Sequence, residues 1–297
     1  MAELESTRIE IPSLNSGWRA GQHVRLRVLS LGMGWWGWTE THPFTIANVA
    51  NGPEGLVLIV KKSGTWTRRL YDIAKISGYT DGGVGRQVKV MVEGPYGGPG
   101  HTLFSSFSSA VFVVGGSGIS FALASIQDLI KKDLNGESRV KSIDLIWSVP
   151  DPQALIPLLP TLQAMIQQSV FTPIRVAVYY TRAPIGKFPF KPDEDFPSGL
   201  TLAPGRPRIN KVVEGAIAKA VQLGAGCKDD EPITGLIVGV CGPVALADDV
   251  AVAVNSIEPL RRDQVGGIEI HEECVFGSVL ISPEQLGLPS HRRVFGW

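Results

Sequence analysis

Residues 111–120 read Val-Phe-Val-Val-Gly-Gly-Ser-Gly-Ile-Ser, and this stretch decides the fold of the second part of the chain. Four apolar residues predict a buried strand, and the glycines lead from it into an apolar helix at 121–132. Glycine allows the backbone to approach a pyrophosphate, and the first N–H groups of a helix favour such an anion. An ordinary turn between a strand and a helix fits the same residues, because the spacing differs from G-x-G-x-x-G and no ribose-binding acid is evident beyond it.

The sequence on either side of this stretch predicts two kinds of sheet. Beyond it, apolar strands alternate with helical segments, which is typical of a parallel sheet with helices on both faces. These predicted elements are, in chain order, 143–148, 154–168, 174–180, 236–240 and 244–257. Residues 8–100 contain short apolar runs separated by Gly, Pro and Asn, which favours a small antiparallel barrel. We therefore predict a β barrel at 1–104 followed by an α/β domain at 105–297, with a Pro- and Phe-rich surface insertion at 184–207.

Composition restricts the classes of function. The chain has 297 residues, of which 44% are hydrophobic, so it is long enough for two domains with large cores. Its formal net charge is +0, which argues against nucleic acid and favours small-molecule partners. Cys227, Cys241 and Cys274 are too far apart to predict a zinc site or a disulfide framework, and no metal ligands are expected. Neither a signal peptide nor a membrane-spanning run is evident, so we expect the chain as given to be soluble and cytoplasmic.

Two polar motifs follow predicted strands of the parallel sheet. Thr181 and Arg182 lie just beyond the strand at 174–180, at the edge where ligands bind in open α/β sheets. The Arg182 guanidinium suits a 2′-phosphate, which would favour NADPH over NADH, but a solvated surface arginine fits the sequence almost as well. Cys241 ends the strand at 236–240 and is either a contact for a nicotinamide ring or a small buried residue.

Three segments of the predicted barrel are rich in candidate contacts. His42-Pro43-Phe44-Thr45 offers a hydroxyl donor toward flavin N5 beside an aromatic ring, or else a strand with a capping histidine and a core phenylalanine. Gly64-Thr65-Trp66-Thr67, followed by Arg68 and Arg69, is typical of a helix N-terminus that suits a diphosphate. Tryptophans flank glycines in the segment from Gly32 to Trp38, and an exposed aromatic loop of this kind favours contact with a membrane or a partner.

The succession of these motifs resembles the C-terminal FAD and NADPH module of fungal ferric-chelate reductases, relatives of the NADPH oxidases within the ferredoxin-NADP reductase group. The resemblance covers nearly the whole chain and implies an antiparallel FAD-binding barrel followed by a parallel-sheet NADPH-binding domain. The matching stretches are Gly21-Gln22-His23, His42-Pro43-Phe44-Thr45-Ile46, Glu93-Gly94-Pro95-Tyr96-Gly97-Gly98, Gly115-Gly116-Ser117-Gly118-Ile119, Tyr180-Thr181-Arg182, Gly205-Arg206-Pro207, Cys241-Gly242-Pro243, His271-Glu272-Glu273 and Phe295-Gly296-Trp297.

For FAD, the resemblance implies that His42 lies toward the pyrophosphate, Phe44 against the flavin ring and Thr45 at N5. Thr67 would lie at the diphosphate, within a motif whose second residue is Asp in the family and Thr65 here. The full set of residues implied for FAD is His42, Pro43, Phe44, Thr45, Gly64, Thr67 and Arg68.

For NADPH, the resemblance implies three groups of contacts. The pyrophosphate would be held by the glycine-rich turn, the adenosine phosphate by residues after strand ends, and the nicotinamide by the Cys-Gly-Pro motif. The residues are, in that order, Gly115, Gly116, Ser117, Gly118, Ile119 and Ser120; Thr181, Arg182 and Arg206; and Cys241, Gly242 and Pro243. Thr45, Cys241 and the terminal Trp297 are the implied catalytic residues, with Trp297 covering the flavin until nicotinamide displaces it.

The implied activity is hydride transfer from NADPH to FAD, followed by one-electron transfer to haem in the parent proteins and to a ferric chelate here. Two alternatives stay open: a catalytically silent paralogue acting as a binding module, and the dehydrogenase part of a superoxide-producing NADPH oxidase. Such reductases carry a membrane domain with two haems, which is absent from this chain, so we expect it at the cytosolic face of a membrane beside a haem domain or partner. The five histidines are scattered, at His23, His42, His101, His271 and His291.

Both ends of the chain depart from the family pattern. The match begins near Arg8, which predicts that the first barrel strand is missing. Residues 274–293 separate His271-Glu272-Glu273 from Val294-Phe295-Gly296-Trp297, and we interpret them as an insertion that makes the tail atypical.

Overall fold

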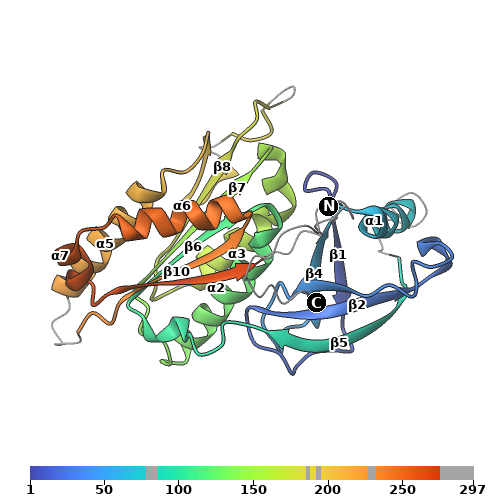
Figure 1. Cartoon of the computed structure of the whole chain (residues 1–297), viewed down its shortest axis with the longest axis horizontal. Helices are drawn as coiled ribbons and strands as arrows, with labels where there is room; N and C mark the ends of the chain where they lie inside the picture. The colour runs from blue at the N-terminus through green and yellow to red at the C-terminus, as the bar shows by residue number, and fades with distance from the viewer. Residues whose placement is uncertain (78–85, 185–187, 192–194, 227–231, 275–297) are drawn as a thin grey trace, which may run out of the picture.

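The short apolar runs in the first hundred residues form five antiparallel strands in the computed structural model (Figure 1). Residues 1–77, 86–184, 188–191, 195–226 and 232–274 are described. The strands are β1 (Ser6–Ile11), β2 (Gln22–Leu29), β3 (His42–Thr45), β4 (Leu56–Lys61) and β5 (Lys89–Gly97). β1 pairs with β4, and β3, β2 and β5 form a second sheet. A bridge between Ile46 and Leu58 joins the two sheets, so that they wrap around one core.

Helix α1 (Thr65–Ser77) closes one end of this antiparallel unit. Its buried side chains Trp66, Leu70 and Ile73 recur at helical spacing and join the core residues of β2 and β4. Burial of large side chains of this kind stabilises a fold by about 1.5–3 kcal/mol each. The antiparallel half therefore has an apolar core of its own.

The second half contains a six-stranded parallel sheet in the order β11-β10-β6-β7-β8-β9. Its strands are β6 (Ser109–Gly115), β7 (Ser142–Val149), β8 (Ile174–Tyr180), β9 (Leu200–Pro204), β10 (Leu236–Gly242) and β11 (Ile268–Cys274). Six of the seven residues of β6 are buried, which is typical of a parallel strand covered on both faces. The fold class is therefore the one the sequence predicts, an antiparallel unit followed by a parallel-sheet domain.

Helices cover both faces of the parallel sheet. α2 (Ile119–Leu134) and α3 (Leu159–Gln168) pack on one face, and α5 (Ile209–Gly226) and α6 (Val244–Asn255) cover the other, followed by the short α7 (Pro259–Gln264). Figure 1 shows α6 in front of the sheet. The segment predicted as one helix at 154–168 begins instead as a 3-10 helix at Pro152–Leu158, which contains Pro157.

One prediction needs correction, because the segment 184–207 is not only a surface insertion. Its residues Leu200–Pro204 form β9, the edge strand of the sheet, and Phe190 is buried in the core. The alternating pattern of Leu-Thr-Leu-Ala suits an edge strand, and the following proline ends it. The domain limits at residue 104 and the missing first strand stay predictions, and the atypical tail beyond Cys274 lies outside the described residues.

The two halves pack against each other through apolar residues and a hydrogen bond. Ala47, Val57 and Ile59 of the antiparallel unit belong to the same buried cluster as α2. The backbone N–H of Val49 donates to the side-chain oxygen of Gln127 on α2, at 3.2 Å. The carboxyl end of β6 is thereby held beside the end of β4.

Candidate functional site

The glycine-rich turn and the Cys-Gly-Pro motif meet where the sheet changes direction. From β6 the chain adds β7, β8 and β9 on one side and then returns to add β10 and β11 on the other, so β6 and β10 flank the switch point. A Cβ at Gly118 would overlap the carbonyl oxygen of Cys241 and lie 2.8 Å from its carbonyl carbon. Ligands of open α/β sheets bind in the crevice at such a point, outside the carboxyl ends of the strands.

Side chains from both halves of the chain lie at the glycine-rich turn. Gly116 has a φ of +53°, which favours glycine, and its carbonyl oxygen accepts a hydrogen bond from Trp147 Nε1 at 3.0 Å. The only atom within 4 Å of a Cβ built on Gly116, among the described residues, is Nζ of Lys61 at 3.6 Å. Lys61 ends β4, so the antiparallel unit directs a cation at the open side of the turn.

Burial divides the predicted nucleotide contacts into two groups. Gly115, Gly116 and Ser117 are partly exposed, so a ligand can reach them. Ile119 is 0% exposed and Ser120 is 3% exposed, so their side chains pack inside the protein and support the turn. Cys241 is also buried, at 1%, whereas the adjacent Pro243 is exposed and Gly242 is partly exposed.

The residues predicted for the adenosine end come together two strands away. The backbone N–H of Gly205 donates to the carbonyl oxygen of Tyr180 at 2.8 Å, which ties the end of β9 to the end of β8. Thr181 and Arg182 follow β8, Arg206 follows β9, and all three are exposed. Neighbouring strands lie about 4.8 Å apart, so the end of β8 is about 10 Å from the end of β6. A dinucleotide extended along this edge of the sheet can reach both places.

The predicted flavin residues lie on β3 and divide between the two faces of that strand. Phe44 stacks on Trp66 of α1 with ring centroids 5.9 Å apart, and His42 lies 4.5 Å from the same indole. Thr45 alternates with these two residues and is paired with His23 of β2. The aromatic group and the hydroxyl that were predicted to contact a flavin are therefore next to each other in the chain but face different neighbours.

Thr67 stabilises the turn that precedes α1. Its hydroxyl accepts hydrogen bonds from the N–H groups of Ser63, at 3.0 Å, and Gly64, at 2.9 Å, and donates to the carbonyl oxygen of Gly64. The hydroxyl is thus engaged by the backbone. The first N–H groups of α1 have no acceptor within the helix, as at any helix N-terminus, and Arg68 beside them is exposed.

His23 connects this region electrostatically to the second half of the chain. Burial lowers the pKa of its imidazole below the ordinary value of 6.5, Glu273 at the end of β11 acts in the opposite direction, and Arg25 lowers the pKa further. The ring lies 6.0 Å from that of Tyr96 on β5. His23 thus lies among polar groups from both halves, next to the predicted flavin residue Thr45.

Sequence reasoning missed Lys61, Trp147 and the role of His23. Lys61 lies 55 positions before Gly116, and only the packing of the two halves brings them together. Trp147 precedes the end of β7, where a tryptophan in a buried strand gives no indication of its hydrogen bond. His23 belongs to the matching stretch Gly21-Gln22-His23, but the sequence assigned no function to its side chain. Trp297, predicted to cover the flavin, lies outside the described residues.

Comparison with known families identifies the domains that carry most of these motifs. The FAD-binding domain family matches residues 3–100, and the family described as the ferric reductase NAD binding domain matches residues 107–184. The chain therefore carries an FAD-binding domain followed by a domain of the ferric reductase NAD-binding family, which is the make-up of an oxidoreductase module.

Several ferric reductases are similar to part of the chain. Ferric reduction oxidase 2 of Arabidopsis thaliana is 36% identical over 108 residues, which are 36% of this chain and 14% of that protein. A protein of Aspergillus oryzae named “Probable cell surface ferric reductase kap2” is 29% identical over 147 residues, 46% of this chain and 18% of that one. A Candida albicans protein named “Probable ferric reductase transmembrane component” is 28% identical over 147 residues, 49% of this chain and 20% of that one. The chain therefore matches a fifth or less of the length of these relatives.

Solved structures agree on the fold. Cytochrome P450 reductase GcoB of Amycolatopsis superposes with a TM-score of 0.54 at 16% identity, over 91% of this chain and 66% of that one. The H286L mutant of ferredoxin-NADP+ reductase from Plasmodium falciparum gives 0.50 at 13% identity, over 91% and 89%. The chain thus has the two-domain fold of these two proteins. Within its described part, no helix combines the length and apolar character needed to cross a bilayer.

Proposed function

We propose that the chain oxidises NADPH with bound FAD and delivers the electrons singly to a ferric chelate, or to haem in a membrane domain. The observation that carries the proposal is the meeting of the Gly115–Gly118 turn with Cys241 at the switch point, beside Lys61 of the FAD-binding half. The arrangement offers a pyrophosphate both backbone N–H groups and a cation. With its pyrophosphate at this turn, a bound NADPH would have its nicotinamide end directed toward the FAD-binding half.

The residues of the FAD-binding half fit a flavin dinucleotide. Arg68 and the N–H groups at the start of α1 suit the diphosphate, with Thr67 holding the turn in place. The partly exposed ring of Phe44, backed by the buried Trp66, offers a flat apolar surface, and the Thr45 hydroxyl supplies a donor on the other side of β3. FAD, when bound, supplies the chemistry of accepting two electrons as hydride and releasing them one at a time.

This chain's own residues would act by binding and orientation. Arg182 and Arg206 would hold the 2′-phosphate of NADPH, which gives the preference over NADH. Gly115 and Gly116 would fix the pyrophosphate, and the buried side chain of Cys241 next to Gly118 would set the depth at which the nicotinamide lies. Holding the reacting atoms within contact distance supplies a large part of the rate. For each NADPH oxidised, two ferric ions are reduced and one proton is released.

The test is reduction of ferricyanide by NADPH with purified chain supplied with FAD, together with stopped-flow reduction of the flavin without oxygen. Thr45→Val should weaken FAD retention or slow flavin reduction, and Cys241→Ala should slow flavin reduction with FAD still bound. Unchanged rates in both variants would put the active site elsewhere. A colourless protein that does not bind added FAD would favour the silent binding module, and superoxide as the main product would favour the oxidase.

We propose that the acceptor lies at the cytosolic face of a membrane. The supporting comparison is a relative named as a transmembrane component. Reconstitution with a haem-containing membrane domain of such a relative, followed by haem absorbance during NADPH addition, tests this point. Absence of haem reduction alongside rapid ferricyanide reduction would exclude haem as the acceptor and leave the ferric chelate.

A further inference from the structure

The loop between β2 and β3 presents large apolar side chains to solvent. We call residues 30–41 the tryptophan loop. Leu31 is 97% exposed, Trp35 91%, Trp36 77% and Trp38 46%. Single apolar side chains on a surface are ordinary, whereas a contiguous cluster marks an interaction site. The tryptophan loop forms the end of the FAD-binding half that lies farthest from the parallel sheet (Figure 1).

The tryptophan loop has a fixed conformation that displays these side chains. Met33 is fully buried in the core beneath it, and its carbonyl oxygen accepts a hydrogen bond from Arg69 of α1 at 2.7 Å. Trp66 of the same helix donates from Nε1 to the carbonyl oxygen of Gly37 at 2.9 Å. A side chain at Gly37 would overlap the backbone of Met33, so the sequence requires glycine there. The backbone that carries the exposed indoles therefore does not have to be ordered when a partner binds, which lowers the entropic cost of binding.

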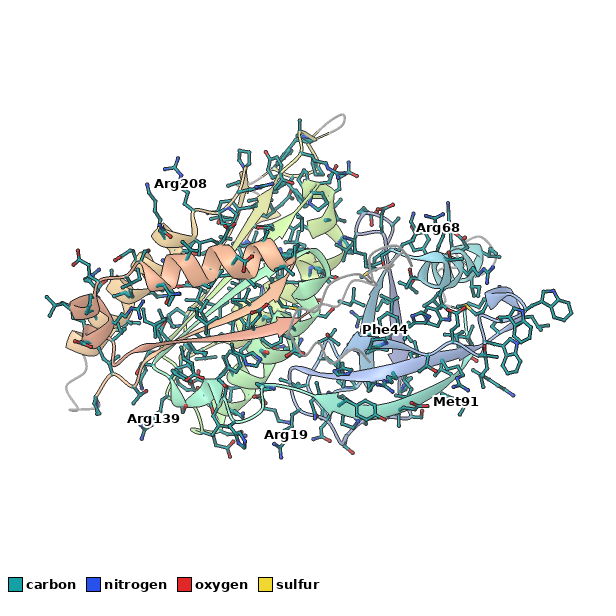
Figure 2. All side chains as sticks on the ribbon, in the orientation of Figure 1. Arg19, Phe44, Arg68, Met91, Arg139 and Arg208 are labelled. Atoms are coloured by element: carbon teal, nitrogen blue, oxygen red, sulfur yellow. The ribbon has the colours of Figure 1, made fainter. Side chains whose placement is uncertain are left out.

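Exposed apolar side chains from two further elements lie near the loop. A Cβ at Gly32 would lie 2.8 Å from Ile73 of α1, and Ile76, one turn further along that helix, is 60% exposed. Met91 of β5 is 50% exposed and pairs across the sheet with Arg27, shortly before the loop begins. Figure 2 shows Met91 on the same end of the molecule.

Charge around the tryptophan loop is basic, although the chain as a whole is neutral. Among the described residues, the exposed Lys75 has no carboxylate partner, and Arg68, also exposed, is the residue proposed above for the FAD diphosphate. The indole nitrogens of Trp35 and Trp36 likewise have no hydrogen-bond acceptor in the described part of the chain. Segments 27–42 and 65–77 together contain four cationic and two anionic side chains. The cations are Arg27, Arg68, Arg69 and Lys75, and the anions are Glu40 and Asp72.

We propose that the tryptophan loop inserts into the headgroup region of a phospholipid bilayer that contains acidic lipids. Tryptophan favours this region because its ring is apolar while its N–H group finds acceptors among phosphates and carbonyls. The cations of α1 add attraction to a negative surface, each by about 1 kcal/mol near the membrane. A purely apolar protein partner would leave both the indole N–H groups and these cations without counterparts. The proposal does not depend on the electron-transfer activity.

The experiment measures binding of the purified full chain to extruded vesicles of phosphatidylcholine mixed with phosphatidylserine. Sedimentation gives the affinity, and quenching of tryptophan emission by brominated phosphatidylcholine reports insertion. The double variant Trp35→Ser, Trp36→Ser is expected to lose about tenfold in affinity per tryptophan, which corresponds to about 1.4 kcal/mol for each. The matched control is Val170→Ser, Phe171→Ser, which removes an apolar pair that is 71% and 70% exposed on the other domain.

Each outcome decides the proposal. The proposal is supported if brominated lipid quenches the wild-type chain, if the Trp35 and Trp36 variant loses binding, and if the control binds as the wild type does. Weaker binding to vesicles of pure phosphatidylcholine also supports it. Absence of binding by the wild-type chain refutes it and leaves a protein partner as the occupant. Equal binding by the wild type and the loop variant also refutes it. A thermal melt of each variant verifies folding, and the quenching result with the wild type needs no variant.

Discussion

Replacing Gly118 with alanine is expected to damage the nucleotide site through a single steric conflict. The backbone of Gly118 is helical, with a φ of −59°, so alanine suits its dihedral angles. The added methyl group would overlap the carbonyl oxygen of Cys241 and lie 2.8 Å from its carbonyl carbon, against an ordinary contact of at least 3.4 Å. Relief of the contact with the carbon alone requires the turn to retreat by 0.6 Å, and relief of the overlap with the oxygen requires more. Overpacking of this kind costs about 1–3 kcal/mol of unfolding free energy.

The same displacement separates the glycine-rich turn from the Cys-Gly-Pro motif. A misplacement of about 1 Å lowers a rate by about 100-fold, so kcat/KM for NADPH should fall by about 10- to 100-fold in Gly118→Ala. The melting temperature should fall by about 2–4 °C per kcal/mol for a domain of this size. Flavin content and the ferricyanide assay give the two readouts.

A second glycine provides the matched control. Gly215 lies in α5, is exposed and has no described atom within 4 Å of an added Cβ. Gly215→Ala should therefore raise stability by about 1 kcal/mol and leave kcat/KM unchanged. The reasoning is refuted if Gly118→Ala has the same melting temperature and the same kcat/KM as the wild type, or if Gly215→Ala loses as much activity.

Three further predictions concern charged groups. Lys61→Ala should raise the KM for NADPH by about tenfold, because one charge-assisted contact is lost, and should not lower stability. The control Lys62→Ala breaks the 3.0 Å ion pair with Glu5 and should leave the KM for NADPH unchanged. The same KM for Lys61→Ala and the wild type would rule out Lys61 as a phosphate contact. Arg182→Ala should reduce the NADPH to NADH ratio of kcat/KM by about 10- to 100-fold, and an unchanged ratio would remove Arg182 from the 2′-phosphate site. The lowered pKa of His23 means that the unfolded chain binds its proton more readily, so stability should fall as the pH drops below 6.5 through the lower, folded-state pKa. His23→Gln should flatten this part of the melting-temperature profile, and a profile identical to that of the wild type would contradict the assignment.

The parallel-sheet half could be predicted from the sequence because its signals are local. Residues 111–118 contain a buried strand, its glycine-rich turn and the start of a helix in one uninterrupted stretch. β9 was missed because an edge strand needs few apolar residues, and Leu200–Pro204 lies within a stretch rich in proline and phenylalanine. Lys61 could not be predicted either, because its position beside Gly116 depends on how the two halves of the chain pack against each other.

Trp66 links the proposed lipid contact to the proposed flavin site. Its ring stacks on Phe44 and lies beside His42, while its Nε1 atom holds the carbonyl oxygen of Gly37 in the tryptophan loop. The side chain is only 4% exposed, so it has little room to adjust to a change on one side without affecting the other. A shift of the tryptophan loop at a bilayer would therefore move Trp66, and Trp66 would in turn move Phe44, the ring proposed to contact the flavin. Trp66 also lies in the first turn of α1, which provides the N–H groups proposed for the FAD diphosphate. The tryptophan loop is thus anchored to the same turn of the helix that would bind FAD.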